Sequence, residues 1–178
     1  MKKILFFTVM MLTATITRAQ INEIAPGVAY GTEMKSIGFL LKGVYQFQDA
    51  NYHLNGEFIL FAPKTEKTSL KTTEINWWEV NANVTYHYEL TDYITIYPLA
   101  GLNIMKYSEV TDTREPGSNR YDAEFNEYEI GLNFGGGFYY FIVDNFYAFW
   151  EGRYLVSDYR QVLVSVGVAY RFGLKQEK

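Results

Sequence analysis

Apolar and polar residues alternate along most of this chain, and the clearest case lies near its end. In the segment QVLVSVGVAYRF, residues 161–172, every even position is apolar, and every odd position except Leu163 is polar or small. Alternation with a period of two predicts a β-strand with two unlike faces. One face must meet the rest of the protein, and the other must meet whatever solvent surrounds it.

The same alternation recurs in seven further segments, and helical periodicity is absent after the first twenty residues. The eight predicted strands are residues 24–31, 36–47, 52–61, 75–89, 93–107, 125–141, 145–157 and 161–172. Clusters of Gly, Pro, Asp, Asn and Ser separate these strands, as turns require. One phase of every strand contains only apolar residues, glycine or proline. A phase shared by eight strands indicates a single sheet with one apolar face.

Two architectures place this apolar face in opposite surroundings. A secreted β-sandwich or a lipocalin-like barrel buries it, whereas a membrane barrel presents it to lipid. The polar phase is rich in Gly and Ala, which weaken a wetted strand face but fill a narrow lumen beside larger side chains. Aromatic residues of the apolar phase gather near strand ends, as in the girdles of membrane barrels. We therefore expect the apolar phase to face lipid.

The predicted connections differ in length between the two ends of the sheet. Residues 48–51, 90–92 and 142–144 are tight turns, whereas residues 62–74 and 108–124 are long and polar. Tight periplasmic turns opposite longer external loops are typical of outer-membrane barrels. The prediction is an all-β fold, an eight-stranded antiparallel up-and-down transmembrane β-barrel. Its location would be the outer membrane of a Gram-negative bacterium, with both termini in the periplasm.

The N-terminus has the parts of a cleaved secretory signal peptide. Lys2 and Lys3 precede an apolar run over residues 4–16, and the small residues Thr17 and Ala19 precede a cleavage point after Ala19. The run is shorter than the roughly 20 apolar residues of a transmembrane helix. The predicted organisation is a signal peptide over residues 1–19, a barrel over residues 20–172 and a short periplasmic tail over residues 173–178.

Composition narrows the function classes. The chain has 178 residues and no cysteine, so disulfides, cysteine-bound metals and a lipoprotein anchor are excluded. Loss of the signal peptide removes three of the 16 basic residues, which leaves 13 against 20 acidic ones and a net charge of −7. This charge argues against a nucleic-acid partner.

The last strand also carries a resemblance to a known family. The segment VSVGVAYRF alternates apolar residues and ends in the aromatic residues Tyr170 and Phe172. With eight strands in one phase, residues 20–172 resemble the small eight-stranded outer-membrane β-barrel superfamily, which includes the barrel domain of outer membrane protein A and outer membrane protein X. The resemblance implies an insertion signal at Tyr170 and Phe172, read by the barrel-assembly machinery, and contact with outer-membrane lipids and lipopolysaccharide. It brings no catalytic motif, and the tail GLKQEK follows where the family usually ends.

The polar phase also carries charged side chains that a closed barrel would turn inward. They are Lys42, Glu57, Glu79, Glu127, Glu129, Glu151, Arg153 and Arg171. The pairing expected between the second and third strands sets Lys42 opposite Glu57. A lone charge in a shielded lumen is costly, whereas a paired one is tolerated. Because eight strands enclose little more than their own side chains, we expect a salt-bridged plug, with an ion-selective pore as the alternative.

The two histidines, His53 and His87, are expected on adjacent strands at the periplasmic end. Together with Glu89 they are conceivable metal ligands, but zinc takes three or four protein ligands or water, so we expect hydrogen-bonded filler and neither metal nor cofactor. Relatives that modify lipid A need a nucleophile or water activated by a base, commonly His, at the external end. The predicted external connections contain no histidine. The sequence therefore predicts that the protein is not an enzyme.

The expected function is a structural or surface-interaction role through external loops 62–74 and 108–124. Lysines in the first loop are candidates for contact with lipopolysaccharide phosphates, and both loops are candidates for binding an extracellular ligand; an ordinary solvated loop is the other interpretation. A narrow porin-like channel is the alternative function. A lipid A-modifying enzyme and a soluble lipocalin-like binder are weaker alternatives.

Overall fold

The computed structural model describes residues 21–47, 51–68, 71–113 and 121–172, and its regular structure in these ranges is entirely β-strand. The predicted signal peptide and tail lie outside the described residues. The strands are β1 (Glu23–Gly31), β2 (Ser36–Gln46), β3 (Tyr52–Phe61), β4 (Lys64–Lys67), β5 (Lys71–Tyr86), β6 (Tyr88–Thr91), β7 (Ile94–Thr113), β8 (Tyr121–Val143), β9 (Phe146–Val156) and β10 (Gln161–Arg171). No helix in the described part of the chain is long and apolar enough to cross a membrane.

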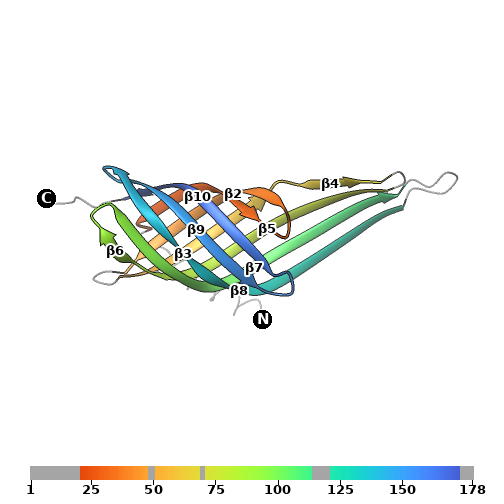
Figure 1. Ribbon diagram of the computed structural model, residues 1–178. Helices are drawn as coiled ribbons and strands as arrows, with labels where there is room; N and C mark the ends of the chain where they lie inside the picture. The colour runs from red at the N-terminus through yellow and green to blue at the C-terminus, as the bar shows by residue number, and fades with distance from the viewer. Residues whose placement is uncertain (1–20, 48–50, 69–70, 114–120, 173–178) are drawn as a thin grey trace, which may run out of the picture.

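Eight of these strands close into one antiparallel barrel. Around the ring the order is β1, β2, β3, β5, β7, β8, β9 and β10, and β10 pairs back with β1. Glu23 at the start of β1 lies opposite Arg171 at the end of β10, so both ends of the barrel chain lie at one rim, which we call the terminal end (Figure 1). The predicted all-β, eight-stranded up-and-down topology is confirmed.

The barrel is inside out relative to a water-soluble protein. Within the described ranges, forty large apolar side chains are exposed, whereas the interior holds sixteen apolar and seventeen polar or charged side chains. On β10, Val166 and Val168 are 43% and 44% exposed, while Glu151 on the neighbouring strand β9 is 1% exposed. The predicted phase is therefore confirmed: the apolar positions face outward and the glycine-and-charge positions face the lumen.

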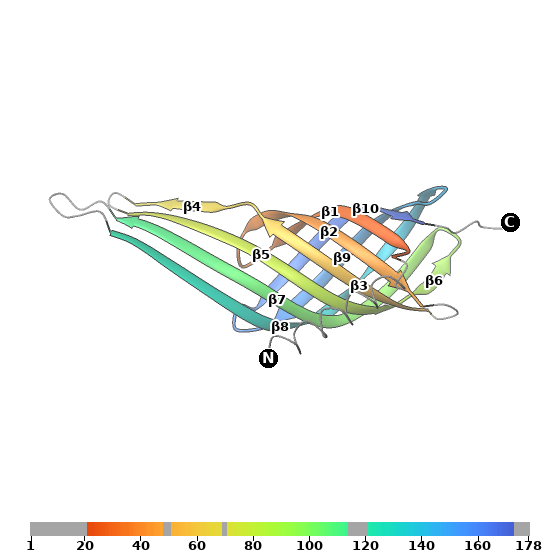
Figure 2. The ribbon, with the colours of Figure 1, turned by 180° about the vertical axis from the view of Figure 1, so that it is seen from behind.

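The two long connections were predicted as loops, and this prediction is wrong. Residues 64–67 form β4, β5 already begins at Lys71, β7 continues to Thr113 and β8 begins at Tyr121. These segments pair with one another and project well beyond the rest of the barrel (Figures 1 and 2). We call this projecting sheet, residues 64–67, 71–76, 108–113 and 121–127, the extension.

Loss of alternation, rather than loss of strand structure, explains the error. In the extension both faces of the sheet carry polar residues, so the apolar phase that marked the other strands disappears. Strand propensity persists through β-branched residues such as Thr72, Thr73, Ile75 and Val110. The extension is therefore a strand region without the hydrophobic pattern of a buried or lipid-facing sheet.

At the terminal end, the predicted strand 75–89 is interrupted. β5 ends at Tyr86, and β6 pairs only with β7 among the described residues. The backbone N–H of His87 between them donates to the carbonyl oxygen of Asn51 (2.8 Å), next to the start of β3. The tight turn predicted at residues 90–92 consequently falls at residues 92–93.

Candidate functional site

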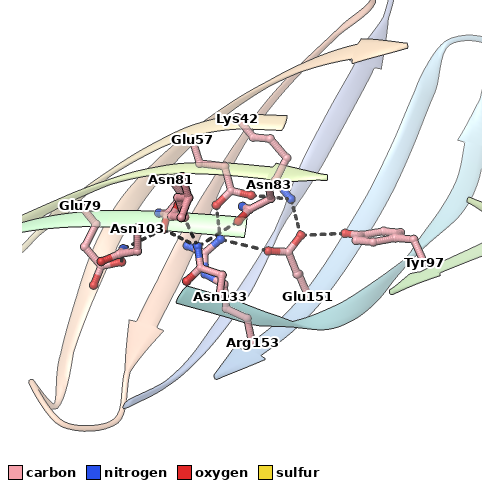
Figure 3. Close-up of polar contacts among 11 residues, drawn as sticks. Lys42, Glu57, Glu79, Asn81, Asn83, Tyr97, Asn103, Asn133, Glu151 and Arg153 are labelled. Carbon is pink, nitrogen blue, oxygen red and sulfur yellow. Dashed lines mark hydrogen bonds and ion pairs between the residues drawn. The ribbon is translucent and has the colours of Figure 1, made fainter. Parts of the chain in front are cut away.

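Four charged side chains meet in the middle of the lumen, and we call them the lumen cluster. Lys42 comes from β2, Glu57 from β3, and Glu151 and Arg153 from β9 (Figure 3). Lys42 Nζ lies 2.7 Å from Glu151 Oε2 and 3.2 Å from Glu57 Oε1. Arg153 Nη1 pairs with Glu57 and lies 3.3 Å from Glu151 Oε1. All four residues are buried.

The barrel topology explains why these groups meet. Lys42 and Glu57 are register partners across β2 and β3, and Glu151 and Arg153 are two residues apart on one face of β9. Around the ring, β3 and β9 are diametrically opposite, so the Arg153–Glu57 pair spans the full width of the lumen. Two cations and two carboxylates also balance in charge, which makes their burial tolerable.

A second group of polar side chains adjoins the lumen cluster. It contains Asn81 and Asn83 of β5, Asn103 of β7 and Asn133 of β8 (Figure 3). Asn133 Nδ2 donates to Asn81 Oδ1 (2.8 Å) and Asn83 Oδ1 (2.9 Å), and Asn103 Nδ2 donates to Asn81 Oδ1 (2.7 Å). These amides were not among the predicted site residues, although their inward phase in the sequence was the available signal.

Glu79 links the asparagine group to the opposite wall. Its Oε2 accepts from Asn103 Nδ2 (3.2 Å) and its Oε1 from Gln161 Nε2 (2.7 Å). Glu79 lies on β5 and Gln161 on β10, again four places apart around the eight-membered ring. Side chains therefore cross the whole lumen at two levels.

The remaining members of the predicted charge set lie elsewhere. Arg171 sits at the terminal end, where its Nε donates to Glu23 Oε2 (2.7 Å) and its guanidinium lies over the ring of Tyr147 (4.1 Å). Glu129 and Glu127 lie at the other end, beside the β9–β10 connection. Glu129 Oε1 accepts from the backbone N–H of Asp158 (2.7 Å). The structure thus divides the eight predicted charges among the lumen cluster, the crossing at Glu79 and the two ends of the barrel.

A small cavity opens at the end of the barrel that carries the extension, and we call it the mouth pocket. It has a volume of about 150 Å³, and its lining includes Met34, Phe61, Trp77, Tyr107 and Tyr159. Met34 belongs to the short connection between β1 and β2 and is buried against the same apolar cluster. The pocket therefore has an apolar floor and an aromatic rim.

Carboxylates hold the two tyrosines of this rim. The hydroxyl of Tyr107 donates to Glu109 Oε2 (2.8 Å), and the hydroxyl of Tyr159 donates to Glu127 Oε2 (3.1 Å). Burial raises the pKa of Tyr159, and the bond to Glu127 raises it further. The Tyr159 phenol therefore stays neutral at physiological pH.

The structure brings the two histidines together at the terminal end. The rings of His53 and His87 stack with centroids 3.7 Å apart, and His87 Nε2 shares a hydrogen bond with Thr85 Oγ1 (3.2 Å). Within the described ranges, no group of three or more His, Cys, Asp or Glu side chains is arranged to hold a metal ion. Both imidazoles are buried at the terminal end, where they line a cavity together with Thr95 and Arg171.

Comparisons with known proteins agree on the fold. No protein-family model matches the chain, and no curated protein matches it significantly. Among solved structures, it is similar to the attachment invasion locus protein Ail of Yersinia pestis, with 21% identity, TM-score 0.56, and coverage of 84% of this chain and 95% of that chain. The N-terminal β-barrel domain of Pseudomonas aeruginosa OprF is 14% identical, with TM-score 0.58 and coverage of 84% of this chain and 96% of that chain. A major outer membrane protein of Thermus thermophilus is 12% identical, with TM-score 0.67 and coverage of 84% of this chain and 98% of that chain.

These neighbours define the class of fold. The chain has the fold of the small eight-stranded outer-membrane β-barrels, which is the family resemblance read from its sequence. Because the identities are low, the likeness concerns fold alone, and function has to be argued from the barrel itself.

Proposed function

We propose that the protein is a non-enzymatic integral outer-membrane barrel that is closed to ions and acts at the cell surface through its extension. The observation that carries the membrane assignment is the inverted burial pattern. A monomeric soluble protein rarely exposes contiguous apolar patches larger than a few hundred Å², whereas an outward apolar band is what a bilayer requires.

The outer boundary of this band can be located on one register row. Trp78, Lys106 and Tyr128 are neighbours across β5, β7 and β8, and Lys106 Nζ lies 5.7 Å from the centre of the Tyr128 ring. Aromatic rings and a long cationic side chain are typical of the headgroup level. On the same face, the next row towards the extension is Ser108 with its polar partners Asn76 and Asn126. We infer that lipid ends at this row and that the extension stands above the membrane.

We propose that the extension lies outside the cell and that both termini lie in the periplasm, because outer-membrane barrels have short periplasmic turns and longer extracellular segments. Trypsin added to intact cells tests it, because the β7–β8 connection carries Arg114 and Arg120. We expect cleavage there while a C-terminal epitope tag on the same chain stays attached to its membrane fragment. If trypsin removed the tag and left the β7–β8 connection intact, the protein would have the opposite orientation in the membrane.

The lumen cluster supports a plug rather than a pore. The links from Arg153 to Glu57 and from Gln161 to Glu79 each join diametrically opposite strands. An eight-stranded barrel has little room beside such side chains. We expect the purified protein in planar bilayers to show no conductance above the lipid baseline, and discrete channel events would favour the narrow porin-like channel instead.

The extension supports a surface-interaction role, because a projecting sheet is more than a closed barrel needs. Its four segments carry seven acidic and three basic residues, so a basic or neutral partner suits it better than a polyanion. Lipopolysaccharide phosphates would instead meet Lys106 at the membrane boundary. The Ail structure in complex with the heparin analogue sucrose octasulfate concerns a related fold, and we expect immobilised heparin not to retain this protein at physiological salt.

Enzyme function has no support in the site. Both histidines of the chain lie at the terminal end, whereas lipid A chemistry takes place at the opposite leaflet. Overexpression is expected to leave the lipid A mass spectrum unchanged, and a new acylation or deacylation product would contradict the proposal.

The terminal strand supports recognition by the barrel-assembly machinery. Tyr170 and Phe172 are exposed on the outer face, with ring centroids 5.1 Å apart, and Tyr170 also contacts Phe146 (5.0 Å). Replacement of both with alanine should lower the assembled fraction in cells more than it lowers refolding into detergent in vitro.

A further inference from the structure

The mouth pocket has a ring geometry that its role as a barrel cap does not require. The rings of Tyr107 and Tyr159 are nearly parallel, with centroids 6.1 Å apart and an interplanar angle of 19°. The indole of Trp77 stands across both, at 5.4 Å and 89° to Tyr107 and at 6.0 Å and 73° to Tyr159. The three aromatic rings therefore form one side of the cavity.

The charges around these rings favour a cation. Each tyrosine hydroxyl donates to a carboxylate, Tyr107 to Glu109 and Tyr159 to Glu127. Such donation increases the electron density of the phenol ring, which strengthens its attraction for a cation. Glu33, a further carboxylate, is exposed in the lining itself.

Lys64, the cation among the described residues of the lining, is already paired. Its Nζ lies 2.7 Å from Glu66 Oε1, and its side chain is 46% exposed. It therefore does not neutralise the rim.

The floor of the pocket restricts the cation to one with an apolar body. Met34, Phe61 and Trp77 are buried there, and they offer no ligands to replace the hydration shell of a metal ion. The volume of about 150 Å³ is below the roughly 300–1,000 Å³ of sites for drug-sized ligands, so the ligand must be small. We propose that the mouth pocket binds a small soluble organic cation of the quaternary-ammonium class, held against Trp77, Tyr107 and Tyr159.

The position of the pocket separates a soluble ligand from a lipid headgroup of the same chemistry. Trp77 and Tyr107 belong to the lumen phase, while their chain neighbours Trp78 and Lys106 belong to the outer phase that faces lipid. A headgroup anchored by acyl chains outside the wall cannot reach the inner side of the same sheet. The ligand therefore enters from the aqueous side of the barrel mouth.

Choline and its neutral carbon isostere, 3,3-dimethylbutan-1-ol, provide the test. The protein is refolded in a non-ionic detergent without choline headgroups, and each probe is titrated by isothermal calorimetry. We expect saturable binding of choline in the millimolar range or tighter, with the isostere at least about fivefold weaker, as a desolvated cation–π contact predicts. Equal affinity for both probes, or no saturable binding of choline, would overturn the proposal.

Variants of the rim assign the contact to particular rings. Tyr159→Leu should weaken choline binding about tenfold, whereas Tyr159→Phe, which keeps the ring but loses the bond to Glu127, should weaken it only a few-fold. The matched control is Tyr128→Leu, because Tyr128 lies on the outer face of β8, away from the pocket.

Two further checks keep these results interpretable. Retention of heat-modifiable gel migration shows that each variant is folded. An unchanged affinity in Tyr159→Leu would overturn the site, and competition by phosphatidylcholine vesicles would overturn its assignment to a soluble ligand. A choline site at the barrel mouth could be present or absent whether or not the extension has a surface-interaction role.

Discussion

Glu151 is the side chain on which the lumen cluster most depends, because it holds three partners. Its carboxylate accepts from Lys42 Nζ (2.7 Å), from Arg153 Nη1 (3.3 Å) and from the hydroxyl of Tyr97 (3.0 Å). Glu151→Gln leaves two buried cations with one carboxylate, and breaking a buried pair costs about 3–5 kcal/mol. We expect a loss of that size in the free energy of unfolding, measured by urea titration of the protein folded in lipid vesicles.

The control for this prediction is Glu129→Gln, which also removes one carboxylate charge, but from a half-buried side chain at the barrel mouth. There we expect a loss of about 1 kcal/mol or less. The double variant Lys42→Met with Glu151→Gln should be more stable than the sum of the single losses predicts, because it removes a cation together with its carboxylate. Equal losses in Glu151→Gln and Glu129→Gln would contradict the importance of the cluster.

Single residues also show where the sequence stops being informative. Period two assigns Lys42, Glu79, Glu129 and Arg171 to the inner face, and the pairing of Lys42 with Glu57 follows from one hairpin. The phase does not give height along the barrel axis, which depends on the stagger accumulated across all eight strands. For this reason the partnership of Glu57 with Arg153, on opposite walls, could not be predicted, and neither could the separate levels of Glu129 and Arg171.

At the scale of elements, the seam between β1 and β10 closes the barrel, and it depends on a close approach of two glycines. Gly27 and Gly167 are register partners. A methyl group on Gly167 would overlap the carbonyl oxygen of Pro26 and come within 2.6 Å of the Phe149 ring. Gly167→Ala should therefore destabilise the barrel by about 1–3 kcal/mol, as overpacking does, in the same urea titration.

Gly152→Ala on the neighbouring strand β9 is the matched control. A methyl group there meets no atom within 4 Å, and alanine reduces the backbone freedom of the unfolded chain, so stability should stay the same or rise slightly. A comparable loss in both variants would mean that strand glycines act through backbone propensity alone, rather than through the seam.

Elements differ in how far their sequences reveal them. The strands of the closed barrel, such as β10, are recognisable because apolar residues on the outer face alternate with polar or small residues on the inner face. The extension carries the same backbone pairing, yet Glu74, Val110 and Glu124 on one of its rows show no such contrast. A strand with polar residues on both faces leaves only strand propensity as a sequence signal, and that signal is weak.

In the proposed membrane setting, the solvent around the whole molecule changes from lipid to water along the barrel axis, and one pair of substitutions measures that change. Val166 and Val110 are both outward-facing and similarly exposed, at 43% and 41%, but Val166 lies in the middle of β10 and Val110 in the extension. Val166→Lys should cost about 2–4 kcal/mol, the penalty for a lysine near the bilayer midplane. Val110→Lys should leave the free energy of unfolding unchanged or raise it slightly, because the new lysine would lie beside Glu74 and Glu124 on the same row. Unfolding from lipid vesicles gives both values. If the free energy of unfolding fell by the same small amount in both variants, water would surround the barrel along its whole length and the membrane assignment would fail.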